Sequence, residues 1–294
     1  MAVAFAPVAG RRRWRAEVLI VLGLSLGQSA VYAILRLIDR LTQAVPLADQ
    51  TAAMNTSASP KPWLDLLYQL AGSAFGVMPA LLALFFLAAP GGNAGNTGNT
   101  GNAGNATGAG NAGNATGAGN ADNTGNATGG NWAGARRIGL TLARPARDLA
   151  WGAALAGGIG LPGIALYLAG RELGLTVHIS TASLDQYWWT IPVLVLAALQ
   201  NGLLEEVVAV AYLAERLTAM GWPAWAWIAG SALLRGSYHL YQGFGPFIGN
   251  VAMGLVFAWF YHRWRRVMPL VVAHTLIDVV AFVGPSLLDP AWLS

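Results

Sequence analysis

The chain contains no cysteine and few charged residues. The absence of cysteine excludes disulfides, thiolate nucleophiles and cysteine-ligated metal sites. Charged residues make up only 10% of the 294 residues and hydrophobic residues 55%, a balance typical of polytopic membrane proteins. The net charge of +4 comes from short arginine clusters beside apolar runs, which indicate membrane topology and not nucleic-acid binding. We therefore expect the lipid bilayer as a partner and no nucleic acid.

Long apolar runs predict an all-α, polytopic transmembrane helical bundle of about seven spans. Most runs reach the roughly 20 residues needed to cross a hydrocarbon core of about 30 Å. The run after Arg15 could pass for a signal peptide, but it is too long for one and favours an uncleaved first span. The expected spans are 17–38, 63–89, 149–169, 188–214, 223–241, 245–262 and 267–288.

Arginine clusters predict the orientation of these spans. Clusters precede the first and third spans, and arginines also follow the fourth and sixth. The positive-inside rule places all of them, and the N-terminus, on the cytoplasmic side of the cell membrane. Loops 41–62 and 170–187 carry few basic residues and would lie outside.

A low-complexity segment divides the chain. Residues 91–131 are almost entirely Gly, Asn, Ala and Thr, and one nonapeptide occurs at both 101–109 and 110–118. Such a segment has too little apolar surface to offset its chain entropy, so we expect a disordered linker. It would separate a two-helix transmembrane part, 1–90, from a five-helix core, 135–290, that carries the unusual polar residues.

Three expected spans of that core carry ionisable residues, which cost about 2.5–3.5 kcal/mol each when charged in a bilayer. Glu205 and Glu206 are adjacent, and helical neighbours point about 100° apart, so one would face a cavity and the other a neighbouring helix. His239 follows Arg235 by four residues and shares its helix face. His274 and Asp278 have the same spacing, so the carboxylate could orient the imidazole.

Each of these groups also has a structural interpretation. The glutamates could be buried carboxylates hydrogen-bonded between helices. Tyr238, His239 and Tyr241 could form an interfacial aromatic belt. His274 and Asp278 could be a helix-packing pair.

Together the groups favour hydrolytic chemistry. A buried glutamate can act as a general base toward water, and a histidine can share that water or stabilise an oxyanion. Glu205, His239 and His274 could instead hold a divalent metal such as zinc, because carboxylates and imidazoles are both zinc ligands.

At these residues the chain resembles the CPBP family of intramembrane proteases, also called the Abi or CAAX-protease family, which includes the Ras-converting type of CAAX prenyl endopeptidase. Its motifs are E-E-x-x-x-R, an aromatic residue four positions before a histidine, and H-x-x-x-N/D. The matching positions, in this order, are Glu205, Glu206 and Val210; Arg235 and His239; and His274 and Asp278. Two positions depart from the motifs, because Val210 replaces the arginine and Arg235 the aromatic residue. Our hypothesis is that Arg235 supplies the missing cation from a neighbouring helix.

The resemblance implies an intramembrane endopeptidase that hydrolyses a membrane-associated, lipid-proximal peptide, which could be CAAX-like, at a site open to the cytoplasm. It implies that Glu205 activates water with help from His239, with Glu206 in support. His274 and Asp278 would stabilise the oxyanion or bind a metal. A metalloenzyme and a metal-free glutamate mechanism both stay open.

Two other functions remain as alternatives. Val210 motivates a catalytically inactive CPBP-fold protein with a binding or immunity role. An ion-coupled transporter could use buried carboxylates as a relay, although the halves show no inverted repeat.

The expected spans place the residues at different depths. Glu205 and His274 would lie about 10–14 Å from their cytoplasmic helix ends and His239 about 24 Å from its own. The three can meet only if the fifth span starts deeper, tilts or breaks, and we expect an irregularity near Gly230 or Gly236.

Overall fold

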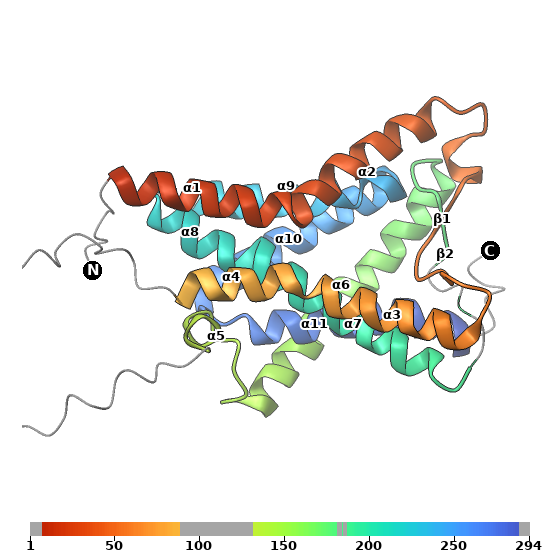
Figure 1. Ribbon diagram of the computed structural model, residues 1–294. Helices are drawn as coiled ribbons and strands as arrows, with labels where there is room; N and C mark the ends of the chain where they lie inside the picture. The colour runs from red at the N-terminus through yellow and green to blue at the C-terminus, as the bar shows by residue number, and fades with distance from the viewer. Residues whose placement is uncertain (1–7, 89–131, 181–183, 185–186, 288–294) are drawn as a thin grey trace, which may run out of the picture.

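The computed structural model describes residues 8–88, 132–180, 184 and 187–287, and helices dominate these residues (Figure 1). The predicted linker at 91–131 lies wholly outside them, and the domain boundaries stay predictions. The α-helices are α1 (Val8–Gly23), α2 (Leu26–Leu41), α3 (Pro62–Gly76), α4 (Met78–Ala88), α5 (Ala133–Arg137), α6 (Pro145–Glu172), α7 (Thr190–Glu205), α8 (Leu213–Ala219), α9 (Ala224–Tyr238), α10 (Phe244–Trp264) and α11 (Met268–Leu287).

Several helices are apolar enough to cross a membrane. Among the described residues, four runs meet the length and composition that a span needs, and the bent pair α1–α2 would make five. The four runs are Pro62–Ala88, Pro145–Glu172, Thr190–Ala219 and Phe244–Trp264. The predicted count of seven is not confirmed, because α9 has only 15 residues and the apolar part of α11 is also short.

The first predicted span, 17–38, is wrong as a single helix. The chain bends by 50° between α1 and α2. At the break the hydroxyl of Ser25 donates a hydrogen bond to the carbonyl oxygen of Val21 at 2.6 Å. A Cβ at Gly27 would lie 2.8 Å from the carbonyl oxygen of Leu22, so only glycine fits there. A side chain that competes for a helix carbonyl is a known cause of such bends.

The irregularity expected in the fifth span lies in the fourth instead. Between α7 and α8 the chain forms a π-helix, η2 (Glu206–Tyr212), whose seven residues are all buried. The helix α9, by contrast, is regular through Gly230 and Gly236. Because α8 continues to Ala219 and α9 begins at Ala224, Glu205 and His239 both lie roughly 20 Å from the connecting loop. The difference in depth predicted from the sequence therefore disappears.

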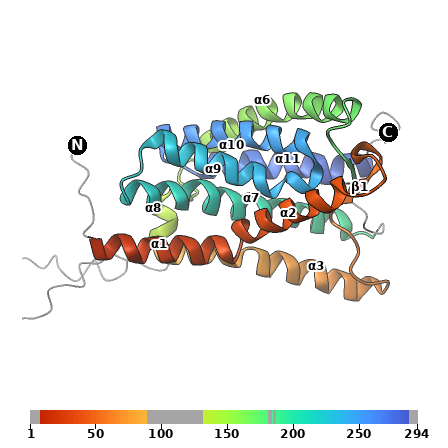
Figure 2. The same cartoon turned by 90° about the horizontal axis from the view of Figure 1, so that it is seen from above.

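The N-terminal helices pack directly on the C-terminal ones. Helix α2 packs against α9, α3 against α7, and α4 against η2. Figure 2 shows α1, α2 and α3 along one side of the bundle and α6 on the opposite side, with α10 and α11 between them. Arg216 of α8 forms a 2.8 Å ion pair with Glu17 of α1. The two parts predicted from the sequence thus share one buried interior.

The all-α prediction needs one correction. Strand β1 (Thr51–Ala53) pairs in parallel with β2 (His178–Ser180), with Thr51 opposite His178. The strands come from the two loops that carry few basic residues, and Figure 1 shows them together at one end of the bundle. This small sheet joins the N-terminal and C-terminal parts.

Candidate active site

The two glutamates lie where α7 changes into the π-helix. Glu205 is the last residue of α7 and Glu206 is the first of η2. The side chain of Glu206 is 0% exposed, whereas that of Glu205 is 12% exposed. Isolated π-helical turns occur frequently at functional sites. The exposure separates the glutamates: only Glu205 retains some access to its surroundings.

The guanidinium of Arg235, on α9, bridges both glutamates. Its Nη1 donates to Oε2 of Glu205 at 3.3 Å, and its Nη2 donates to Oε1 of Glu206. Arg235 is 0% exposed, and its guanidinium carbon lies 5.5 Å from the ring centroid of Phe257 on α10. A planar two-pronged cation can satisfy two carboxylates that point in different directions. The hypothesis that Arg235 supplies a cation from a neighbouring helix therefore has the geometry it requires.

His274, on α11, contacts the same carboxylates. Its Nδ1 lies 2.7 Å from Oε1 of Glu206, and its Nε2 lies 3.9 Å from Oε2 of Glu205. Because a carboxylate only accepts, Nδ1 carries the proton that bonds to Glu206. The other ring nitrogen then faces Glu205 and, at 3.7 Å, Oδ1 of Asp278.

A further polar residue on α7, Asn201, was missed in the sequence. Its amide donates to Oδ2 of Asp278 at 3.2 Å. Asn201 lies four residues before Glu205 and so shares its helix face, and this spacing is the signal that could have identified it. It links α7 to α11 through the carboxylate beside His274.

Tyr238 contacts Glu205 and does not lie in an interfacial belt, which was the structural interpretation left open for it. Its hydroxyl donates to Oε2 of Glu205 at 2.6 Å, and the residue is only 6% exposed. An interfacial belt residue would keep its hydroxyl in the headgroup region. Tyr238 instead holds the same oxygen of Glu205 that Arg235 contacts.

His239 follows α9 directly and lies beside this cluster. Its ring centroid is 4.9 Å from that of Tyr238, and its charge would interact with Glu205, Arg235 and His274. Both ring nitrogens are buried, and neither makes a hydrogen bond of standard geometry with another described residue. Gln242 is close enough to interact with the ring, and the imidazole retains capacity to bond to a substrate or to water.

The structure tests whether these residues fit a metal. Among the described residues, no three His, Asp or Glu side chains are arranged to hold one. The expected ligands Glu205, His239 and His274 therefore do not form a metal-binding arrangement either. The guanidinium of Arg235 lies against both glutamates, where a metal cation would have to bind them. As arranged here, these donors do not fit a metal.

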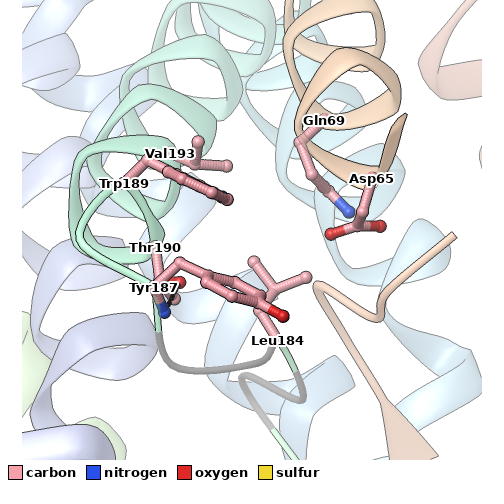
Figure 3. Close-up of a pocket in the computed structure, with 7 residues that line it drawn as sticks. All are labelled: Asp65, Gln69, Leu184, Tyr187, Trp189, Thr190 and Val193. Atoms are coloured by element: carbon pink, nitrogen blue, oxygen red, sulfur yellow. Dashed lines mark hydrogen bonds between the residues drawn. The ribbon is translucent and has the colours of Figure 1, made fainter. Parts of the chain in front are cut away.

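A pocket elsewhere contains none of these residues. It lies between α3 and the start of α7 (Figure 3). Asp65 and Gln69 of α3 face Tyr187 and Trp189, whose rings stack with centroids 4.8 Å apart. Thr190, in its lining, lies about 22 Å along the helix from Glu205. This pocket is a separate feature of the opposite end of the fourth predicted span.

Comparison with known protein families identifies the segment that carries the cluster. Residues 187–280 match the family described as Rce1-like, type II CAAX prenyl endopeptidase. No curated protein and no solved structure matched the chain. The family match confirms the predicted resemblance to the CAAX proteases over this segment. The apolar helices indicate a membrane protein.

Proposed function

We propose that the chain is an intramembrane endopeptidase that hydrolyses a peptide bond with water activated by Glu205. The observation that carries the proposal is the buried cluster of Glu205, Glu206, Arg235 and His274, contributed by three helical segments within the matched region. Buried ionisable groups in a membrane span are costly, which favours a use for them. The substrate would be a membrane-associated peptide, as the family description suggests, and a prenylated CAAX C-terminus is the specific candidate.

Glu205 is the better candidate for the base. Both its hydrogen bonds, from Tyr238 and Arg235, use Oε2, and its side chain has the partial exposure that Glu206 lacks. It can therefore accept a proton from water through Oε1 while Oε2 stays fixed. Glu206 bonds to Arg235 and His274 and has the role of a supporting carboxylate.

The reaction needs one proton transfer in each direction. The water oxygen attacks the carbonyl carbon of the substrate while Glu205 accepts a proton from the water. The carbon–nitrogen bond then breaks, and Glu205 returns the proton to the leaving amine. General-base assistance of this kind contributes about 10²–10⁴-fold to the rate.

The histidines supply the hydrogen bonds around the reacting carbonyl. The ring of His239, beside Gln242, would hold the water or the oxyanion, which gains most from donors fixed in a buried site. His274 would be kept in one tautomer by Glu206, and its Nε2 would point toward the reacting groups with Asp278 behind it. Asn201 would position Asp278.

The replacement of the motif arginine by Val210 does not leave the glutamates without a cation. Arg235 occupies the position where the second motif has an aromatic residue, and it contacts both glutamates. This contact is the specific argument against an inactive binding protein. It also supports the metal-free glutamate mechanism, because the cation beside the carboxylates is part of the chain.

The test is hydrolysis in detergent by the purified chain. Peptides ending in a farnesylated CAAX sequence, the same peptides without the lipid, and internal membrane-proximal peptides would be offered. We expect Glu205→Gln to lower turnover about 10³-fold and His239→Ala about 10²-fold, in line with the loss of a general base and of an oxyanion donor. Glu172→Gln and His262→Ala, both exposed, are the matched controls.

Three outcomes separate the alternatives. Wild-type turnover in Glu205→Gln would overturn the assignment of the base. Binding of a peptide without hydrolysis by the wild type would indicate the inactive relative. Proton flux in liposomes that depends on Glu205, without hydrolysis, would indicate the transporter.

A further inference from the structure

A second, basic pocket lies at the ends of three helices, away from the glutamates. It is lined by the start of α6, the end of α10 and the loop into α11. The lining residues are Arg144, Arg147, Asp148, Trp151, Phe260, Trp264, Arg266 and Pro269. Because α6 and α10 are long enough to span a membrane, their ends lie near the membrane–water interface.

The base of the pocket is fixed by one ion pair. Arg266 donates from Nε to Oδ1 of Asp148 at 2.5 Å and from Nη2 to Oδ2. It also donates to the side chain and the carbonyl of Thr141, at 3.1 and 2.7 Å. The hydrogen bonds to Asp148 raise the pKa of Arg266, so its charge persists. Asp148 is the only carboxylate in the lining, and both of its oxygens therefore accept hydrogen bonds from Arg266.

Two positive charges remain at the mouth of the pocket. Arg144 and Arg147 are exposed, and Asp148, with both oxygens on Arg266, does not neutralise them. Arg144 is the N-cap residue of α6 and Arg147 lies in its first turn, and both line the same pocket. A pair of arginines with free donors binds phosphate oxygens well.

The other wall is aromatic and faces lipid. Trp264 packs against Phe260 and Trp151, with ring centroids 4.3 and 5.8 Å apart. Trp151 itself is 41% exposed, and only 6% of the apolar window of α6 is buried within the protein. Tryptophan is the residue that prefers the headgroup level of a bilayer, so the pocket combines phosphate-binding and acyl-chain-binding surfaces.

We propose that this pocket binds the phosphodiester headgroup of an anionic phospholipid from the surrounding bilayer. The phosphate is held between Arg144 and Arg147, and the upper acyl chain lies along Trp151 and Trp264. Neither the family match nor the proposed hydrolysis assigns a ligand to these residues. The site would fix the depth of α6 and of the α10–α11 loop relative to the membrane surface.

The experiment measures thermal unfolding of the full chain in phosphatidylcholine nanodiscs that contain increasing fractions of phosphatidylglycerol. The wild type should become more stable as phosphatidylglycerol is added. Each basic residue near an anionic surface contributes about fivefold to affinity. Arg144→Gln with Arg147→Gln should therefore lower the affinity for phosphatidylglycerol roughly 30-fold, and a higher fraction of this lipid should be needed for the same rise in melting temperature. The double variant should fold normally, because both side chains are exposed.

The matched control is Arg12→Gln with Arg15→Gln, which removes the same charge from exposed positions on α1. It should lose clearly less of the stabilisation by phosphatidylglycerol than the Arg144/Arg147 variant, because it removes only general surface attraction. An equal loss in both double variants would mean general surface attraction and would overturn the proposal. So would full stabilisation of the Arg144/Arg147 variant, or equal stabilisation of the wild type by inorganic phosphate in neutral nanodiscs, which would indicate a free-ion site.

Discussion

Arg235 and Glu206 form an ion pair in which neither side chain is exposed to solvent, between α9 and the first residue of the π-helix. Bringing two charges out of water is costly, and the geometry must return that cost through further hydrogen bonds. Here Glu206 also accepts from His274, and Arg235 also donates to Glu205. The pair therefore forms the centre of a network that fixes three helical segments relative to one another.

Removal of Arg235 should destabilise the protein and abolish activity together. Arg235→Leu leaves two buried carboxylates without a cation, and breaking one side of a buried pair costs about 3–5 kcal/mol. We expect a lower melting temperature in detergent and loss of hydrolysis, with Arg235→Lys intermediate because an ammonium lacks the two-pronged geometry. Arg263→Leu, at an exposed position on α10, is the control. Unchanged folding and activity in Arg235→Leu would refute the role assigned to this arginine.

The hydroxyl of Tyr238 should matter for turnover more than for folding. Tyr238→Phe removes one hydrogen bond to Oε2 of Glu205 and keeps the ring that packs beside His239. A hydrogen bond to a charged group is worth about 1.5–3 kcal/mol, so we expect a roughly 10- to 100-fold lower kcat with a nearly unchanged KM. Tyr241→Phe, whose hydroxyl accepts from Gln242, provides the comparison. A larger effect of Tyr241→Phe than of Tyr238→Phe would contradict the assignment.

Gly202 should be needed for the close approach of α7 and α11. A Cβ at this position would meet Oγ1 of Thr275 at 2.7 Å and the carbonyl oxygen of Val271 at 3.1 Å. Small residues at such contacts let membrane helices approach closely. Gly202→Ala should therefore lower the melting temperature and turnover, because Glu205 and His274 lie on these two helices.

Gly230, on α9, is the matched control for this substitution. A Cβ there meets nothing within 4 Å, so Gly230→Ala should be neutral or stabilising by up to about 1 kcal/mol from helix propensity. Equal melting temperatures for the two alanine variants would show that the α7–α11 contact tolerates a side chain.

Chelators should leave hydrolysis unchanged. The guanidinium of Arg235 lies against the carboxylates that a metal would need. We expect full activity after treatment with 1,10-phenanthroline and less than stoichiometric zinc by elemental analysis. Loss of activity that returns on addition of zinc would instead support the metalloenzyme alternative.

Local properties of the sequence determined the membrane character and the candidate residues. Apolar runs of sufficient length predict helices without reference to the rest of the fold, and motif spacings such as His274–Asp278 place side chains on one helix face. Breaks in those helices were less predictable. The bend lies at the hydrogen bond from Ser25 to Val21, and the π-helix after Glu205 is wholly buried among its neighbours.

Only the tertiary structure decided which residues meet. The equal depth of Glu205 and His239 follows from the continuation of α8 to Ala219, which the hydropathy pattern does not mark. The contacts of Arg235 with both glutamates, of Tyr238 with Glu205 and of Asn201 with Asp278 join different helices. Sequence spacing fixes directions within one helix but not the rotation of one helix against another, and that rotation is set by side-chain packing along the whole interface.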